Sequence, residues 1–168
     1  MTQPLWTPSA ERIERSNMTA FSRSVEQRYN TSLDSYAELQ RWSVDHPEAF
    51  WESVWNFCDL RYSKHYSSVL GNGDQFPGAR WFEGAELNFA ENLLRRRDNK
   101  IALVSLLENG RRSELSYAEL YHKVEQLADA MIKLGVARGD RVAGFMPNIP
   151  ETVIAMLAAS SIGAVWSS

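Results

Sequence analysis

The stretch RVAGFMPNIPETVIAMLAASSIGAVWSS, residues 141–168, decides the fold that we expect for this chain. It opens with a short, mainly apolar run, 141–146, which predicts a strand. Pro147 ends this strand, because proline has no N–H to donate to a sheet ladder. Asn148 then precedes a helix start, since Pro150 fits the first helical turn, where its missing N–H would have no partner in any case.

The helix that follows is apolar or small on nearly every side from Val153 to Ile162, so we expect neighbours to cover more than one of its faces. Gly163 ends the helix, and residues 164–166 begin another strand. A strand, a crossover helix and a second strand this close together predict a parallel, right-handed βαβ unit. Because such a unit is an interior piece of an α/β sheet, we expect the 168 residues to be part of something larger.

The segment before this unit predicts a hairpin and a long amphipathic helix. Residues 101–107 and 112–115 are strand-like, and the Asn109–Gly110 pair between them is a strong hairpin signal. Ser116 and Glu119 have the spacing of a capping box at the start of a helix. The helix carries apolar residues at helical spacing: Leu120, Val124, Leu127, Met131 and Leu134. From the hairpin onward the order of elements is therefore β-β-α-β-α-β.

The first part of the chain predicts three helices rich in aromatic side chains. One helix runs to Tyr29, a second follows Asp34, and a third is opened by Asp45. Pro47 fits the first turn of the third helix. The third helix carries a stripe of large side chains: Phe50, Trp51, Val54, Trp55 and Cys58. This stripe could line a ligand pocket, but packing is the better interpretation, with the Cys58 thiol buried and inert.

The middle of the chain, residues 60–100, is irregular. Turn-forming residues at 71–74 predict a loop, and they hold too few oxygen ligands for a calcium-binding loop. A short helix is expected to begin near Asn88. The cationic run Arg95–Arg97 is interpreted as a solvated helix end, which places positive charge near a helix C-terminus.

Composition and charge exclude several classes of function. The chain is 44% hydrophobic with a net charge of −3, and it has no basic stripe that would predict binding to nucleic acid or to an anionic membrane. His46, His65 and His122 are scattered, without the spacing of a metal ligand set. There is no apolar signal region at the amino terminus, and no apolar run reaches about 18 residues. We therefore expect a cytoplasmic protein without membrane insertion.

These patterns together predict the α/β fold class. We expect residues 1–100 to form a helical, aromatic-rich amino-terminal prelude. This prelude would pack on the first part of a mixed, partly parallel sheet. Residues 101–168 would be the start of the α/β domain that contains the sheet, which we expect to be incomplete.

The same residues resemble a known family of enzymes. The stretch SELSYAELYHKVEQLADAMIKLGVARGDRVAGFMPNIPETVIAMLAASSIGAVWSS (113–168) resembles the beginning of the large, AMP-binding domain of AMP-forming acyl-CoA synthetases, in the adenylate-forming superfamily. Upstream, three segments resemble in order and spacing the amino-terminal region of the acetoacetate-activating branch: LWTPSAERIERSNMTAF (5–21), YAELQRWSVDHPEAFWESVWNF (36–57) and FPGARWFEGAELNFAENLLRR (76–96). The acetate-activating branch shares the Trp81–Asn88 motif but matches the paired tryptophans of the second segment less well.

The resemblance implies a two-step reaction of ATP, acetoacetate or a similar short acyl or keto acid, and coenzyme A. The carboxylate attacks the α-phosphorus of ATP to give an acyl-adenylate and pyrophosphate, and the thiol of coenzyme A then displaces AMP. This chemistry needs a Gly/Ser/Thr-rich phosphate loop, Mg²⁺ and a cationic side chain. The family's loop has the form S/T-G-T-T-G-x-P-K and has no match in residues 1–168, where the nearest stretch, Ser160–Gly163, is a helix end.

No catalytic, cofactor-binding or metal-binding residue is therefore assigned between residues 1 and 168. The turn Asn148–Glu151 could face a ligand at a sheet switch point, but it has no glycines that would let a phosphate approach, so we interpret it as helix capping. We expect the amino-terminal part of an acetoacetate-CoA ligase, inactive by itself and completed by the remainder of the synthetase. The alternatives are a non-catalytic partner-binding module derived from such an enzyme, and a piece of an acetyl-CoA synthetase-like enzyme.

Overall fold

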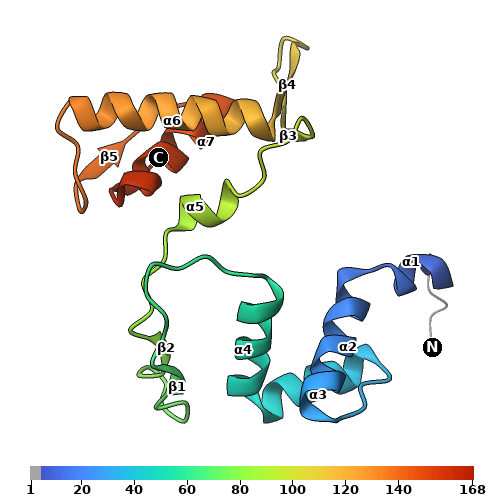
Figure 1. Ribbon diagram of the computed structural model, residues 1–168. Coiled ribbons are helices and arrows are strands. Elements are labelled where there is room, and N and C mark those ends of the chain that lie inside the picture. Colours follow the sequence, from blue (N-terminus) through green and yellow to red (C-terminus); the bar gives the residue numbers. More distant parts are fainter. Residues whose placement is uncertain (1–4) are drawn as a thin grey trace. The chain divides into compact units, whose positions relative to one another are not determined.

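The computed structural model of the protein describes residues 5–168 and divides into two compact units (Figure 1). Unit 1 consists of the residues up to Leu60 together with Tyr66–Ala85. Unit 2 consists of Arg61–His65 and Glu86–Ser168. A short segment of unit 2 is thus inserted in the sequence of unit 1.

Unit 1 is mainly helical and has a single apolar core among its described residues. Its elements are α1 (Ala10–Glu14), α2 (Asn17–Tyr29), α3 (Tyr36–Asp45), α4 (Pro47–Phe57), β1 (Ser68–Gly71) and β2 (Arg80–Glu83). The buried residues of the core are Phe21, Val25, Leu33 and Leu39, with Tyr29, Trp42, Phe50 and Val54 packed against them. Helices α2, α3 and α4 therefore share one hydrophobic interior, as three amphipathic helices predict.

Helix α4 packs aromatic side chains against two different neighbours within unit 1. On one side, Phe50 meets Phe21 of α2 edge to face, with ring centroids 5.8 Å apart. On another side, Trp55 is only 4% exposed and packs on Tyr66 and Phe82, with ring centroids 5.2 and 4.7 Å apart. The aromatic stripe is therefore a packing feature, as predicted, but it serves two faces of the helix.

Three expectations for the amino-terminal helices are wrong. The first helix is divided in two, because Ser16 begins α2 by accepting a hydrogen bond from the Thr19 N–H at 3.1 Å. Asp45 is the last residue of α3, and His46 precedes α4 without a side-chain cap. Cys58 is exposed rather than buried, and it is the C-cap that follows the last residue of α4.

The irregular middle of the chain contains a hairpin that its turn-rich sequence did not predict. Strand β1 pairs with β2 in antiparallel fashion, and Leu70 lies opposite Trp81. The connection includes the expected turn residues, and Asn72 takes a positive φ of 54° there. A short helix begins after Asn88, as predicted.

Unit 2 is built around two long helices. Its elements are α5 (Phe89–Leu93), β3 (Ile101–Leu106), β4 (Arg112–Ser116), α6 (Tyr117–Lys133), β5 (Arg141–Ala143), α7 (Pro150–Ile162) and β6 (Val165–Ser167). Its buried core consists of Ala90, Leu94, Leu115, Leu120, Val124, Ile154, Leu157 and Ala158. The predicted capping box is present, since the Ser116 N–H donates to Glu119 Oε2 at 2.8 Å and the Glu119 N–H donates to Ser116 Oγ at 3.2 Å.

The strands of unit 2 form two separate pairs. Strands β3 and β4 make the predicted antiparallel hairpin around Asn109–Gly110. Strands β5 and β6 are parallel, and α7 is the crossover between them, so the predicted βαβ unit is confirmed. The α/β class is confirmed as well, although among residues 5–168 the two pairs do not join into one continuous sheet.

Candidate functional site

Asn88 is the N-cap of α5 and also clamps the end of α7. Its Oδ1 accepts a hydrogen bond from the Glu91 N–H at 3.1 Å, which is the usual N-cap contact. Its Nδ2 donates to the carbonyl oxygens of Ser160 and Ser161 at 2.9 and 3.2 Å. These carbonyls lie in the last turn of α7, which lacks the regular four-residue hydrogen bonds, although the Ser160 carbonyl also accepts from the Gly163 N–H at 3.0 Å. One amide side chain thus satisfies polar groups at two helix ends.

Asn92 binds the inserted segment of unit 2, Arg61–His65, through hydrogen bonds of its side-chain amide. Its Oδ1 accepts from the Arg61 N–H at 2.9 Å, and its Nδ2 donates to the Arg61 carbonyl oxygen at 2.9 Å. Nearby, Lys64 and Glu86 form an isolated antiparallel bridge. The two asparagines, four residues apart on α5, therefore connect α5 to segments that are distant in the sequence.

The turn between β5 and α7 is closed by a threonine. Thr152 Oγ1 donates to the Pro147 carbonyl oxygen at 2.7 Å. The N-cap position is held by Ile149, which offers no side-chain acceptor, so the expected place of Asn148 next to the helix start is shifted by one residue. Pro150 occupies the first turn, as predicted. The turn therefore begins a helix, as predicted.

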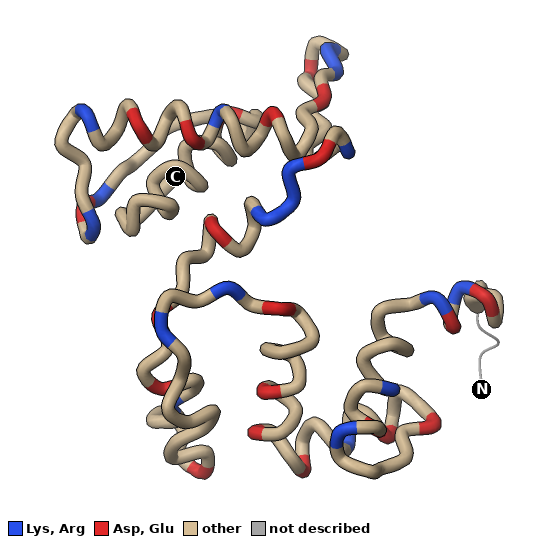
Figure 2. The backbone as a smooth tube through the Cα atoms, viewed as in Figure 1, with Lys and Arg blue, Asp and Glu red and all other residues tan. Residues whose placement is uncertain are grey.

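The cationic run Arg95–Arg97 lies between α5 and β3, where Figure 2 shows it as a continuous blue stretch. It is exposed, as predicted, but its side chains make specific contacts. The Arg97 guanidinium carbon lies 3.6 Å from the centroid of the Tyr121 ring. Arg96 Nε donates to Asp98 at 2.8 Å, and this hydrogen bond lowers the pKa of the Asp98 carboxyl. These contacts therefore stabilise the local conformation of the segment between α5 and β3.

Glu52 of α4 is the centre of a polar network in unit 1. Arg28 of α2 lies 2.7 Å from its carboxylate, and the hydroxyl groups of Tyr29 and Tyr66 donate to it at 3.4 and 3.3 Å. Burial, reinforced by the charge of Glu52, raises the pKa of Tyr66. The network joins α2, α4 and the segment before β1, and all of its members serve packing in unit 1.

An apolar pocket of about 350 Å³ lies between α2, α3 and α4. It is lined chiefly by Met18, Phe21, Leu39, Phe50 and Phe57. No Asp, Glu, Lys, Arg or His side chain lines it, and its polar groups are those of Asn17, Tyr36, Gln40, Ser43 and Cys58. It is the kind of gap left between three helices around aromatic rings.

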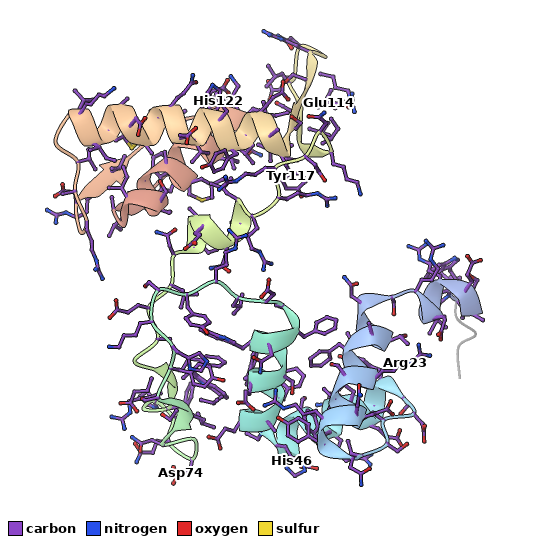
Figure 3. The ribbon with its side chains drawn as sticks, viewed as in Figure 1. Arg23, His46, Asp74, Glu114, Tyr117 and His122 are labelled. Atoms are coloured by element: carbon purple, nitrogen blue, oxygen red, sulfur yellow. The ribbon has the colours of Figure 1, made fainter. Side chains whose placement is uncertain are left out.

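The described residues contain no group of three or more His, Cys, Asp or Glu side chains that could hold a metal ion. Figure 3 labels His46 at the start of α4 and His122 on α6, which belong to different units. His65 lies beside the ring of Tyr62, with centroids 5.0 Å apart. Over the part of the chain that was searched, no helix is long and apolar enough to cross a membrane.

Two protein families match successive parts of the chain. Residues 36–93 match the acetyl-coenzyme A synthetase N-terminus family, and residues 89–168 match the AMP-binding enzyme family. The two matches overlap on α5, which includes Asn92 and is capped by Asn88.

Individual relatives extend over nearly the whole chain. Acetoacetyl-CoA synthetase of Xenopus tropicalis is 42% identical over 167 residues, which are 98% of this chain and 25% of the relative. Malonamoyl-CoA synthetase of Penicillium aethiopicum is 36% identical over 171 residues, covering 98% of this chain and 23% of the relative. A solved acetoacetyl-CoA synthetase from Streptomyces lividans matches with a TM-score of 0.88 and 42% identity, over 99% of this chain and 26% of its own. The chain thus spans about a quarter of the length of the proteins it matches.

The fold is therefore that of the amino-terminal part of an adenylate-forming synthetase. More narrowly, the chain is homologous to the amino-terminal quarter of the acetoacetyl-CoA synthetases, at about 40% identity over 98% of its length. The resemblance of residues 5–96 to the acetoacetate-activating branch is confirmed by these matches. The sequence did not indicate that Asn88 and Asn92 bind distant segments, although the two asparagines are four residues apart at the start and within one short helix.

Proposed function

We propose that this chain supplies the amino-terminal part of an ATP-dependent acetoacetate-CoA ligase. The observation that carries the proposal is the match to the Streptomyces lividans acetoacetyl-CoA synthetase, with a TM-score of 0.88 and 42% identity over 99% of this chain. In the proposed reaction, an acetoacetate oxygen attacks the α-phosphorus of ATP and pyrophosphate leaves. The sulfur of coenzyme A then attacks the acyl carbon, and AMP leaves with the bridging oxygen. Mg²⁺ would neutralise the phosphate charge in the whole enzyme.

Within that enzyme, the role proposed for residues 1–168 is a supporting one. The sequence holds no phosphate loop of the family's form, and its polar clusters are used to connect helices. The clamps of α5 fix the end of α7 and the inserted segment, and the capping box fixes the start of α6. We therefore propose that the 168 residues alone do not form acetoacetyl-CoA. The compartment that fits this proposal is the cytoplasm, where ATP and coenzyme A are available.

The test compares the chain with a fusion. The 168-residue chain is assayed for AMP release from ATP, acetoacetate and coenzyme A, and it should release none above a protein-free blank. The same chain is then fused in place of the matching first quarter of the Streptomyces lividans enzyme, and this fusion should release AMP. The control is the Streptomyces lividans enzyme with its first quarter deleted. AMP release by the isolated chain would disprove the supporting role, and a folded but inactive fusion would disprove the assignment to a ligase.

A second candidate differs only in the acid that is activated. The relative from Penicillium aethiopicum is named as a malonamoyl-CoA synthetase and is 36% identical, and the family matching residues 36–93 is named for acetyl-coenzyme A synthetase. Acetate and malonamate are therefore the competing substrates to compare with acetoacetate. A non-catalytic module that binds a synthetase is the remaining alternative, and AMP release by the fusion would count against it.

A further inference from the structure

The apolar pocket between α2, α3 and α4 of unit 1 is large for a space between packed helices. Protein interiors are close-packed and hold few voids larger than a water molecule, whereas pockets that bind small molecules have volumes of about 300–1,000 Å³. The volume of this pocket, about 350 Å³, lies in the second range. Met18 and Phe57 in its lining are 51% and 40% exposed, so the pocket opens to solvent and a small molecule can reach it.

The lining of the pocket favours an uncharged, apolar occupant. Three phenylalanine rings in it contact one another, since Phe21 meets Phe50 and Phe57 edge to face with ring centroids 5.8 and 5.3 Å apart. Met18 adds a flexible, polarisable thioether that adapts to the shape of an occupant. Because no Asp, Glu, Lys, Arg or His of the described residues lines the pocket, a charged occupant would lose its hydration without gaining an ion pair.

The polar groups of the lining can bind one neutral end of an occupant. The amides of Asn17 and Gln40 both donate and accept hydrogen bonds, as an alcohol or a primary amide also does. The Ser43 hydroxyl already donates to the Gln40 carbonyl oxygen at 2.7 Å, within its own helix. The lining therefore matches a molecule that is mainly hydrocarbon and carries one neutral polar group.

We propose that this pocket binds a small uncharged molecule of that class, such as a medium-chain alcohol or primary amide. An engineered cavity of about 150 Å³ binds benzene, so the pocket can hold a ligand of roughly twice that size. The site lies within unit 1 and does not depend on the ligase function proposed above. By mass action, a ligand of the folded pocket also stabilises unit 1 against unfolding.

A protein partner fits the pocket less well than a small molecule does. Eleven residues line the pocket, whereas a stable protein–protein interface engages about 20–30 residues on each side. A second copy of the chain, or a segment of a longer polypeptide, would therefore need a much wider surface than the pocket provides.

The test titrates straight-chain primary alcohols, from 1-butanol to 1-decanol, into the full 168-residue chain with ¹³C-labelled methionine methyl groups. Met18 lines the pocket, whereas Met131 and Met156 pack against the core of unit 2 and are internal controls. The Met18 resonance should shift to saturation while the two controls stay unchanged. Affinity should rise about fourfold for each methylene taken out of water and level off once the chain fills the pocket. At neutral pH, 1-octanol should bind at least about tenfold more tightly than octanoate.

A pair of variants at one position tests the location of the site. Ser43→Phe should abolish the saturable shift of Met18, because the added ring takes up the space. The matched control, Ser43→Ala, should bind 1-octanol within about twofold of the wild type, since the lost hydroxyl bonds only within its own helix. Thermal unfolding followed by circular dichroism checks that both variants fold, and the alcohol series on the wild type decides the matter if Ser43→Phe does not.

Four results would overturn the proposal. The first is a Met18 shift that does not saturate, or that Met131 and Met156 share. The second is octanoate binding as tightly as 1-octanol, which would exclude the uncharged class. The third is a chain that is dimeric by light scattering and that 1-octanol makes monomeric, which would assign the pocket to a second copy. The fourth is loss of 1-octanol binding in the fusion to the Streptomyces lividans enzyme, which would assign it to that polypeptide. AMP release by the fusion is measured separately, so failure of this site and failure of the ligase function are distinguishable.

Discussion

The substitution Asn88→Ala tests the clamp between α5 and α7. It removes the N-cap contact to Glu91, worth about 1 kcal/mol. It also removes the shared donor to Ser160 and Ser161, worth about 0.5–1.5 kcal/mol net. The expected loss in the unfolding free energy of unit 2 is about 2 kcal/mol. This corresponds to about 30-fold faster exchange of those α7 amides that exchange through unfolding of unit 2.

Asn88→Asp separates the two contributions. The aspartate keeps an oxygen that can accept from Glu91, so α5 should stay capped. At the other atom, a carboxylate oxygen replaces the donor and faces carbonyl oxygens at the negative end of the α7 dipole. Exchange should therefore accelerate in α7 but not in α5, whereas Asn88→Ala should accelerate it in both.

The measurement is hydrogen exchange by mass spectrometry on peptides covering α5 and α7. Gln126→Ala is the matched control, because it removes an exposed amide side chain from α6 in the same unit. It should change the free energy of opening, as derived from exchange, by less than about 0.5 kcal/mol. If α7 in Asn88→Asp exchanged at the wild-type rate, the contacts to Ser160 and Ser161 would contribute nothing and the reasoning would be refuted.

Two further predictions concern single residues. Trp55→Ala should destabilise unit 1 by about 3–5 kcal/mol, because the residue is 4% exposed, whereas Trp51→Ala, at a residue 43% exposed, should cost less than about 2 kcal/mol. Urea unfolding followed by circular dichroism measures both losses of stability, and equal losses would contradict the difference in burial. Hydrogen bonds from Ser116 lower the pKa of Glu119 below its ordinary 4.5, so the capping box stabilises the fold above that pH and loses its effect as the pH falls through the lowered value. Glu119→Gln should therefore make unfolding less sensitive to acid below about pH 4.5, and an unchanged pH profile would count against the box.

Elements whose signals are local were predictable from the sequence. Ser116 and Glu119 are three residues apart and satisfy each other, so their spacing specifies the start of α6. The same is true of the turn Asn109–Gly110, which needs only its own backbone preference to form a hairpin. The βαβ unit was predictable because α7 has no polar face to expose.

Features that depend on distant partners were not predictable. The β1–β2 hairpin joins short strands through a long connection, and its pairing of Leu70 with Trp81 leaves no short-range pattern. The amphipathic pattern of α4 did not show that Trp55 faces the hairpin while Phe50 faces α2. The second role of Asn88 was hidden for the same reason, since its acceptor Ser160 is 72 residues away.

The contacts of Asn88 and strand β6 are connected through a short piece of backbone. Helix α7 ends at Ile162, Gly163 turns the chain in the left-handed region with a φ of 82°, and β6 begins at Val165. Asn88 holds the carbonyls of Ser160 and Ser161, so it fixes the backbone only a few residues before that strand. A chain without these two hydrogen bonds holds Val165 less firmly in place. Asn88→Ala should therefore accelerate amide exchange in β6 as well as in α7, although Asn88 is distant from β6 in the sequence.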